Sequence, residues 1–248
     1  MSAQNPTSEK SLSWSSHAIT NVGKVRKHNE DSVLARPEIG LWVVADGMGG
    51  HAKGDVASQM IVESMKKIHE GTTLAKFIDD IEDRINDVNQ KLVDIARESK
   101  KRITIGSTVV MMHTYDKYCV YLWAGDSRLY RLRDNKLSLV TTDHSQVEQY
   151  VEQGIISRAE AEVHPHGNMI TRAVGATEEF FLDMDIQEMK RGDRYMLCSD
   201  GLTKHTNDSE IEDFMRSGNT EECCQYFIDV TLERGAGDNV TCIVIDIE

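Results

Sequence analysis

The sequence predicts an α+β fold in which antiparallel sheets carry helices on their faces. Segments with strand character come in blocks and helical segments come in pairs, without the regular β-α-β alternation of a doubly wound parallel sheet. The 248 residues contain no internal repeat, only three prolines and no Pro/Gly-rich linker. These features favour a single domain over residues 12–248, after a flexible polar leader over residues 1–11.

The first part of the chain is predicted to form three strands and then two helices. The strands are expected at residues 14–21, 32–35 and 41–45, and the first helix at residues 55–69. The second helix, at about 73–99, carries apolar residues at three-and-four spacing and has Thr72 or Thr73 available as an N-cap. This apolar face could bind a partner helix, but packing in the core is the stronger expectation.

A second block of strands follows, with helices near the end of the chain. Strands are expected at 108–114, 118–124, 127–132 and 136–141, then at 180–186, 194–199 and 240–247. Asp134-Asn135 predicts a tight hairpin, and Arg191-Gly192-Asp193 a turn. Helices are expected at about 209–216 and 220–233. The polar, irregular segment at about 143–175, with a short helix near 146–153, is predicted to be an inserted flap.

Four aspartates beside glycines, each at one end of an apolar strand-like segment, are the strongest functional signal. They are Asp46, Asp126, Asp200 and Asp238. Any one of them is typical of a turn. Four at the ends of separate strands instead suggest one oxygen-ligand site assembled from distant segments. Carboxylates with little His or Cys nearby suit Mg²⁺ or Mn²⁺ rather than zinc.

Composition argues against some classes of partner and compartment. The formal net charge of −13 argues against binding to a nucleic-acid backbone. No apolar run approaches the length of a membrane span, and the start of the chain lacks the apolar core of a signal peptide. The five cysteines form no C-x-x-C pair and are expected to be buried free thiols. We therefore expect a cytoplasmic protein.

A polar turn between the first two strands adds an arginine and two acids to this picture. A guanidinium such as that of Arg26 can grip a phosphate group bidentately, and Glu30 or Asp31 can hold a metal-bound water. A solvated charged turn is an equally good interpretation of this segment alone.

Two divalent ions bridged by a carboxylate activate a water for attack on a phosphate ester. The segment at Gly47 lacks the Lys and Ser/Thr of a P-loop, and no G-x-S-x-G motif is present.

Seven motifs occur in an order that resembles a known family. They are Arg26 to Asp31, Asp46-Gly47-Met48-Gly49-Gly50-His51, Gly125-Asp126-Ser127-Arg128, Asp143-His144-Ser145, His164-Pro165 with Asn168 and Ile170-Thr171-Arg172-Ala173, Ser199-Asp200-Gly201-Leu202, and Gly237-Asp238-Asn239-Val240-Thr241. Over residues 14–247 the chain resembles the metal-dependent serine/threonine protein phosphatases (the PPM, or type 2C, family), bacterial branch. The resemblance implies a β-sandwich of two antiparallel sheets flanked by helix pairs, in four α-β-β-α layers.

The resemblance also implies a role for each acidic residue. Asp46 would bridge two Mn²⁺ or Mg²⁺ ions, with the carbonyl of Gly47 on the second ion and Asp200 and Asp238 on the first. Glu30 and Asp31 would act through metal-bound waters, and Arg26 would bind the substrate phosphate. Asp126 would join a third, weaker metal site, shared with Asp200.

One position departs from the family pattern as animal members have it. They often carry a histidine, a proposed general acid, two residues after the bridging aspartate, and here that position is Met48. Our hypothesis is that a water on the third ion supplies the proton. His51 is an alternative donor, although a structural role is the stronger expectation. His28, His144, His164 and His166 are expected to make polar contacts in loops or in the flap.

The resemblance implies hydrolysis of phosphoserine and phosphothreonine in proteins by a metal-activated water. The partners implied are phosphorylated proteins, including a eukaryotic-like Ser/Thr kinase that this enzyme opposes. The chain is also similar to phosphatases that are paired with kinases of type VI secretion. We expect a monomer. Two alternatives remain: a catalytically silent phosphoprotein-binding regulatory domain of the same fold, and two-metal hydrolysis of a phosphodiester or nucleotide, which the net acidity disfavours.

Overall fold

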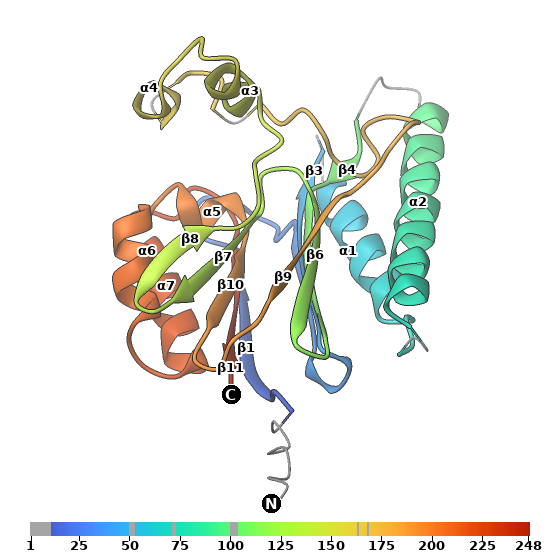
Figure 1. The fold of residues 1–248 in the computed structure, drawn as a ribbon. Helices are drawn as coiled ribbons and strands as arrows, with labels where there is room; N and C mark the ends of the chain where they lie inside the picture. Colours follow the sequence, from blue (N-terminus) through green and yellow to red (C-terminus); the bar gives the residue numbers. More distant parts are fainter. Residues whose placement is uncertain (1–10, 50–52, 71–72, 100–103, 163, 168) are drawn as a thin grey trace, which may run out of the picture.

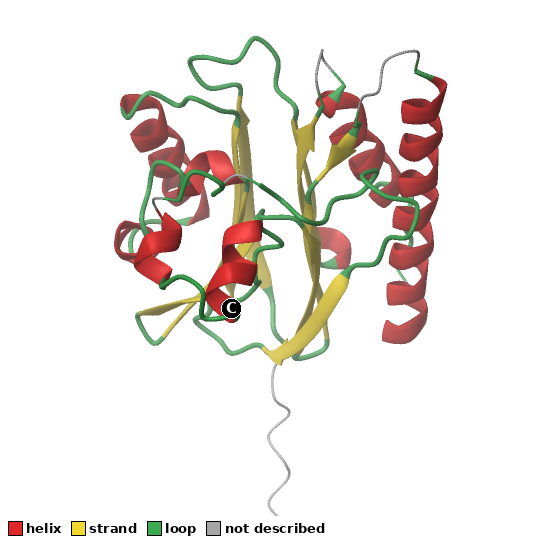
Figure 2. Ribbon diagram, turned by 90° about the horizontal axis from the view of Figure 1, so that it is seen from above, coloured by secondary structure: helices red, strands yellow, loops and turns green. Residues whose placement is uncertain are grey.

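Two antiparallel sheets stack face to face, and helices cover the outer face of each (Figure 1). The structure is a computed structural model that describes residues 11–49, 53–70, 73–99, 104–162, 164–167 and 169–248. Residues 1–10 of the predicted leader therefore lie outside the described residues. Seen from above, the sheets stand between two helical layers (Figure 2). The α+β fold and its four layers are confirmed.

One sheet joins the two ends of the described chain. Its strand order is β1-β11-β10-β7-β8, with every neighbouring pair antiparallel. The strands are β1 (Trp14–Asn21), β7 (Arg128–Arg133), β8 (Lys136–Leu139), β10 (Arg194–Cys198) and β11 (Val240–Ile247). In the hairpin between β7 and β8, Asp134 and Asn135 both have positive φ, of 52° and 60°. The predicted tight hairpin is confirmed, since Asp and Asn tolerate this region better than most residues.

The other sheet has the strand order β2-β3-β5-β6-β9, with a short strand β4 pairing with β3. Its strands are β2 (Asp31–Arg36), β3 (Leu41–Met48), β4 (Gly106–Ser107), β5 (Val109–Tyr115), β6 (Tyr118–Ala124) and β9 (Asp183–Glu188). A single 3₁₀ turn, η1 (Pro37–Ile39), connects β2 to β3. Strand β3 is central and almost wholly buried, which fixes the position of whatever its last residues carry.

Three apolar cores hold the four layers together. The first packs α1 (Gly54–Met65) and α2 (Leu74–Glu98) against the β2–β9 sheet, around residues such as Ile61 and Ile85. The second lies between the sheets and includes Trp42 and Tyr195. The third packs α6 (Asp208–Met215) and α7 (Thr220–Glu233) on the other sheet. The face of α2 predicted to be apolar therefore packs in the core, as expected.

Three of the differences from the sequence prediction concern the helix after β3 and the segments around β9 and β10. The helix predicted to reach residue 69 ends at Met65. The strand predicted at 180–186 is β9, which begins at Asp183, because Phe180 and Leu182 pack against the first core without pairing to β6. A four-residue helix α5 (Asp200–Thr203) directly follows β10 where no helix was predicted, since four residues are too few to show a helical period.

The segment between β8 and β9 crosses above α5 in Figure 1 and contains two short helices. They are α3 (Gln146–Glu152), capped by the Ser145 hydroxyl, and α4 (Arg158–Glu162). Only α3 was expected from the sequence. Few of the side chains in this segment are buried, in contrast to the sheets.

The two ends of the described chain meet at one end of the sandwich, and Asp238 lies at the other end. At one end, Trp14 pairs with Ile247, and Ser13 and Glu248 exchange backbone hydrogen bonds of 2.7 and 2.9 Å. At the other end, Asn21 pairs with Val240, just after Asp238. No helix in the described part of the chain is long and apolar enough to cross a membrane.

Candidate metal centre

The structure brings the predicted carboxylates together at one end of the sandwich. Asp31 begins β2 and lies opposite Asp46 of β3 in the antiparallel register. Asp126 follows β6, Asp200 begins α5, and Asp238 precedes β11. The charges of the other four all act on Asp46, so residues up to 207 positions apart in the chain share one site (Asp31 to Asp238).

Asp31 is held by the hydroxyl groups of Thr241, in β11, and Ser199, which directly follows β10. Its Oδ2 accepts hydrogen bonds from Ser199 Oγ (2.8 Å) and Thr241 Oγ1 (2.7 Å). The second oxygen, Oδ1, is buried and has no hydrogen-bond partner. Two neutral donors thus fix the carboxylate in place and leave one oxygen free for a ligand.

The backbone around Asp46 is also fixed by hydroxyl groups. Thr108 Oγ1 accepts a hydrogen bond from the Asp46 amide (3.1 Å), and Ser107 Oγ donates to the Asp46 carbonyl (3.0 Å). Neither contact occupies the carboxylate of Asp46. The side chain is therefore positioned by its backbone.

Burial and mutual repulsion raise the pKa values of three of these acids. Burial, together with the charges of Asp31 and Asp200, raises the pKa of Asp46 well above its usual value. Burial raises the pKa of Asp31 to about 6, against the hydrogen bonds from Thr241 and Ser199. For Asp126, burial and the charge of Asp200 raise the pKa to about 7. A bound divalent cation would offset this repulsion.

A close approach of two backbones explains Gly47. A Cβ at Gly47 would lie 2.0 Å from the Gly54 carbonyl oxygen and 2.6 Å from that of Glu30. The Gly47 amide donates to the Glu30 carbonyl (3.0 Å), and Glu30 Oε1 accepts from the Gly54 amide (3.2 Å). The start of α1, the end of β3 and Glu30 are thereby packed into one unit with no room for a larger residue.

Asp238 is held by two cationic side chains. Arg26 contacts both of its oxygens, with Nε 2.9 Å from Oδ1 and Nη2 3.0 Å from Oδ2. Lys204 Nζ lies 3.3 Å from Asp238 Oδ2 and 2.6 Å from Asp200 Oδ2. The arginine predicted to bind phosphate and an aspartate predicted to bind metal thus lie in direct contact.

The donor set fits a hard divalent ion in its chemistry. Asp31 Oδ1 and Asp200 Oδ1 are buried carboxylate oxygens without a hydrogen-bond partner, and oxygen ligands are what Mg²⁺ and Mn²⁺ prefer. As the side chains stand, however, no three His, Cys, Asp or Glu residues within the described ranges form a group able to hold an ion. Asp238 would have to leave Arg26 and Lys204 before it could serve as a ligand.

Several residues that shape the site were not singled out from the sequence. Asn239 accepts from the Glu30 amide (2.8 Å) and donates to the carbonyls of Val22 and His28 (2.9 and 3.0 Å), which fixes the Arg26 turn. Ser199 and Thr241 stand beside the predicted aspartates in their motifs, but only the acids were assigned roles. Lys204 carried no signal, because its reach to Asp200 depends on the unpredicted helix α5.

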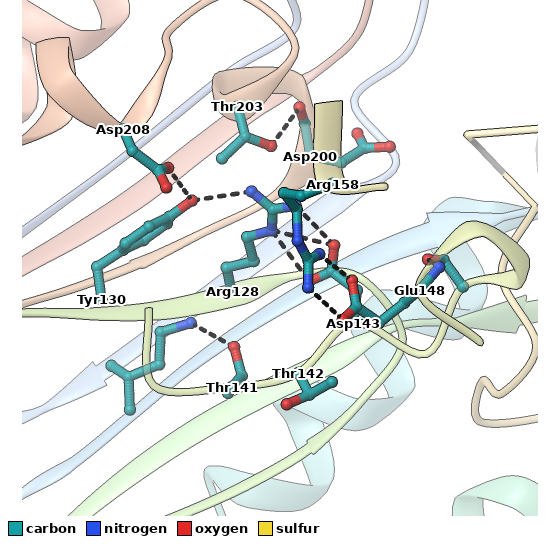
Figure 3. Close-up of polar contacts among 12 residues, drawn as sticks. Arg128, Tyr130, Thr141, Thr142, Asp143, Glu148, Arg158, Asp200, Thr203 and Asp208 are labelled. Atoms are coloured by element: carbon teal, nitrogen blue, oxygen red, sulfur yellow. Dashed lines mark hydrogen bonds and ion pairs between the residues drawn. The ribbon is translucent and has the colours of Figure 1, made fainter. Parts of the chain in front are cut away.

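A cleft of about 1220 Å³ extends from Asp126 and Asp200 beneath α3 and α4 toward α6. In it, Arg128 forms a bidentate ion pair with Asp143 (2.7 and 2.9 Å) and donates to Tyr130 Oη (2.9 Å) (Figure 3). Arg158 of α4 pairs with Glu148 of α3 at the same wall. The cleft is thus polar, and most of the charged side chains that line it already have partners.

The predicted histidine contacts are met at His144. Its Nδ1 accepts from the Gly125 amide (3.1 Å), and its Nε2 lies 3.2 Å from Asp183 Oδ2. Burial lowers its pKa, against the effect of Asp183, which keeps Nδ1 available as an acceptor. His144 therefore positions the loop that carries Asp126. His51, the predicted alternative proton donor, lies outside the described residues.

Comparison with known proteins identifies the family. The model of the family described as "Protein phosphatase 2C" matches residues 24–232. A "Serine/threonine phosphatase stp" of Listeria welshimeri is 33% identical over 235 residues, which cover 92% of this chain and 93% of the relative. The "Serine/threonine protein phosphatase PstP" of Mycobacterium tuberculosis is 32% identical over 230 residues, 93% of this chain and 44% of that longer protein.

Solved structures agree with these matches. PppA, described as a key regulatory component of T6SS in Pseudomonas aeruginosa, superposes with a TM-score of 0.87 at 37% identity, covering 96% of this chain and 100% of PppA. The catalytic domain of PstP in complex with two manganese ions gives a TM-score of 0.84 at 31% identity, covering 95% of this chain and 99% of that domain. The chain therefore belongs to the protein phosphatase 2C family, as a bacterial, metal-dependent serine/threonine protein phosphatase of the PPM type.

Proposed function

We propose that the protein removes phosphate from phosphoserine and phosphothreonine in other proteins at the end of the sandwich where the acids meet. The observation that carries this proposal is the convergence of Asp31, Asp46, Asp126, Asp200 and Asp238, with unpartnered buried oxygens on Asp31 and Asp200. A site of this charge has no use in neutral ligand binding, because it destabilises the protein unless cations neutralise it.

The residues divide into those that hold ions and those that position them. Asp46 and the Gly47 carbonyl would hold two Mn²⁺ or Mg²⁺ ions together with Asp200 and Asp238. When bound, these ions supply an activated water and offset the charge that develops on the phosphate. Glu30 and Asp31 would act through ordered waters, for which the free Asp31 Oδ1 is suited. A third, weaker ion would use Asp126 and Asp200.

Arg26 would bind the substrate phosphate. Its guanidinium presents Nε and Nη2 side by side to the two oxygens of Asp238, and the same pair of donors matches two phosphate oxygens. An ion on Asp238 would release Arg26 for this task. The Arg26 side chain is 48% exposed, so a phosphate on a protein surface can reach it.

The cleft beneath α3 and α4 would admit the polypeptide that carries the phosphate. It begins at Asp126 and Asp200 and is wide enough, at about 1220 Å³, for several residues. We propose that the segment at about 143–175 is a flap that controls this access, within one catalytic domain over residues 12–248.

The partners follow from the activity. A kinase that phosphorylates Ser and Thr must supply the substrates, and its own phosphorylated residues are natural targets. The likeness to PppA supports a connection with type VI secretion. The five cysteines are all buried and unpaired, which supports a reducing compartment, the cytoplasm. We propose a monomer.

A hydrolysis assay tests the proposal against its two alternatives. Purified protein is expected to release phosphate from a phosphothreonine peptide and from p-nitrophenyl phosphate only with Mn²⁺ or Mg²⁺. Asp46→Ala and Asp200→Asn should reduce turnover roughly 1000-fold or more, while Asp79→Asn, an exposed acid on α2, should leave it unchanged. No turnover combined with phosphopeptide binding would favour the silent regulatory domain. Faster hydrolysis of bis-p-nitrophenyl phosphate would favour a phosphodiesterase.

A further inference from the structure

The proposed flap at about 143–175 carries α3 and α4, which project beyond the sheets in Figure 1. Among the residues that the structure describes, the hydrogen bonds and ion pairs of residues 146–169 all stay within residues 145–170. Polar contacts therefore attach the described part of the flap to the sandwich through its base alone. Whatever holds the base sets the position of both helices over the cleft.

Two aspartates hold the base, one against each sheet. Arg128 of β7 forms its bidentate ion pair with Asp143, at 2.9 Å from Nε to Oδ1 and 2.7 Å from Nη2 to Oδ2 (Figure 3). Asp183 is the first residue of β9, the edge strand of the other sheet. Its Oδ2 lies 3.2 Å from His144 Nε2, and its Oδ1 accepts a hydrogen bond from Arg172. One carboxylate thus ties both ends of the flap to the edge of the β2–β9 sheet.

Backbone contacts attach the base to the sandwich at two places. The His144 amide donates to the Gly125 carbonyl (2.9 Å), and Val174 exchanges hydrogen bonds of 2.9 and 3.0 Å with Ser107 of β4. Two points of attachment define a line, about which the flap could still tilt. The side-chain contacts of Asp143 and Asp183 add attachments on opposite sheets and so oppose this tilt.

The arginine of this contact is fixed on its other side as well. The guanidinium carbon of Arg172 lies 4.0 Å from the centre of the Phe181 ring, which is a cation–π contact. Phe181 belongs to the segment that leads directly into β9. Arg172 is therefore held between Asp183 and Phe181, and the end of the flap is joined to β9 by a side chain that both partners orient.

The loop at Asp126 should stay in place without Asp183, because His144 has other contacts. His144 keeps its two hydrogen bonds with Gly125, and its ring stacks on Trp123 with 6.0 Å between the ring centres and 11° between the planes. Trp123 donates in turn to the Thr142 carbonyl (2.8 Å). The tilt of the flap can therefore be changed separately from the candidate metal centre.

Building on the proposed function, we propose that Asp183 is a positioning residue that holds the flap at a fixed tilt over the cleft and thereby determines how well a polypeptide substrate binds. The flap contributes Val147, Glu148 and Arg158 to the wall of the cleft, so a change of tilt alters the wall that a peptide contacts. A small phosphate ester needs only the metal centre and Arg26, and does not depend on that wall.

Steady-state kinetics with two substrates test the inference. Asp183→Asn keeps the size of the side chain but removes its charge. It should raise KM for a phosphothreonine peptide by about fivefold or more, whereas kcat and KM for p-nitrophenyl phosphate should stay within about twofold. Arg172→Gln breaks the same contact from the flap and should give the same pattern. Asp185→Asn is the matched control on β9, since Asp185 contacts Tyr121 (2.9 Å) and no residue of the flap, and should change neither substrate.

A distance measurement follows the tilt without any assay of activity. Spin labels on Glu152→Cys, at the end of α3, and Glu221→Cys, on α7, occupy exposed positions, whereas the native cysteines are buried and should stay unlabelled. Pulsed electron paramagnetic resonance should give one narrow distance distribution in the otherwise wild-type protein. Asp183→Asn and Arg172→Gln should each broaden or shift it, and Asp185→Asn should not.

The outcomes separate this inference from the proposed function. An equal change of KM for both substrates, an unchanged KM for the peptide, or an unchanged distance distribution would overturn the role of Asp183 and leave the proposed function standing. Arg172→Gln decides the same question if Asp183→Asn does not fold. Hydrolysis of neither substrate by the wild type would overturn the proposed function, and the distance distribution would then decide by itself whether Asp183 sets the tilt.

Discussion

Asp31 and Asp238 lie in the same site but are held in opposite ways. Asp31 is buried and receives hydrogen bonds from two neutral hydroxyls, those of Thr241 in β11 and of Ser199, which directly follows β10. Asp238 is a quarter exposed and is held by the charges of Arg26 and Lys204. Hydroxyl donors leave the negative charge of a carboxylate in place, whereas ion pairs neutralise it.

The difference separates the part of the site that is built in advance from the part that must rearrange. Under the proposed function, Asp31 would offer a metal ion or its bound water a fixed, charged oxygen. Asp238 would first have to be freed from two protein cations, one of which we propose as the phosphate ligand. Ion binding at Asp238 and substrate binding at Arg26 are therefore expected to be coupled.

The largest expected effect is on the stability of the part of the site that is fixed by packing between β3 and α1. Gly47→Ala places a Cβ 2.0 Å from the Gly54 carbonyl oxygen, a clash between two backbones that no side-chain movement relieves. We expect a loss of about 3 kcal/mol or more in the free energy of unfolding, measured by urea denaturation. Gly237→Ala is the matched control, since a Cβ there meets nothing within 4 Å. Equal stability of the two variants would show that the β3–α1 contact is loose.

The next effect is the pH dependence of the metal-free protein. Burial raises the folded-state pKa of Asp31 to about 6 from 3.8, so its contribution to stability is fully present below about pH 4 and is lost as the pH rises through 6. Asp31→Asn should therefore be more stable than the wild type above pH 6, by roughly 3 kcal/mol. Urea denaturation from pH 4 to 7 measures the difference.

The difference between the two proteins is the quantity to follow, because His113 acts in the opposite direction. Burial lowers the pKa of His113 to about 4, so its contribution is lost as the pH falls from 6.5 toward 4. His113 is common to both proteins and cancels. A difference that stays constant with pH would contradict the raised pKa of the buried Asp31 carboxyl.

Removing one hydroxyl donor tests the fixed carboxylate directly. Thr241→Val deletes the 2.7 Å hydrogen bond to Asp31, together with a 2.7 Å hydrogen bond to Thr20 Oγ1, while nearly keeping the shape of the side chain. We expect the free energy of unfolding to fall by about 1–3 kcal/mol, because a buried charged group loses a donor. Calorimetric titration with Mn²⁺ should also show weaker binding. Unaltered metal affinity would mean that the donor does not position Asp31.

Removing the arginine from Asp238 should have the smallest effect on stability. Arg26→Ala breaks an exposed ion pair, so the free energy of unfolding should change by less than about 1 kcal/mol. Its effect should instead appear in catalysis, as a raised KM for a phosphopeptide. Arg97→Ala, which removes an exposed ion pair with Glu178, is the control for KM. A large loss of stability in Arg26→Ala would contradict the distinction drawn between the two carboxylates.

The sequence predicted the parts of the fold in which local pattern and tertiary packing agree. The bounds of β1, β6, α7 and β11 match the prediction, because each is a distinct apolar run or amphipathic segment that is followed by polar or glycine residues. The strand predicted at 180–186 was misplaced, since apolar residues there pack on the core without pairing to a neighbour. Apolar character indicates burial, but only the partner strand decides which residues pair.

Prediction of the site from the sequence was limited in the same way, because local patterns do not reveal contacts between distant residues. The acids could be found from the sequence, because aspartate beside glycine at a strand end is a visible local pattern. Three residues hydrogen-bond to partners 160 or more positions away in the chain, and therefore no local sequence pattern could predict their roles. They are Ser199, Thr241 and Asn239. Lys204 depends on the single turn of α5. Sequence patterns thus identified the acids that gather at the candidate site and missed the residues that orient or neutralise them.

The pairing of β1 with β11 brings Ser13 and Glu248 together at the end of the sandwich remote from the acids (Figure 1). Strand β11 separates Glu248 from Asp238 by eight residues in extended conformation, which corresponds to about 25 Å. A fluorophore or a surface tether attached at Glu248 would therefore leave the cleft open. A single-molecule assay could then record phosphopeptide capture and release on an immobilised enzyme whose catalytic end points into solution.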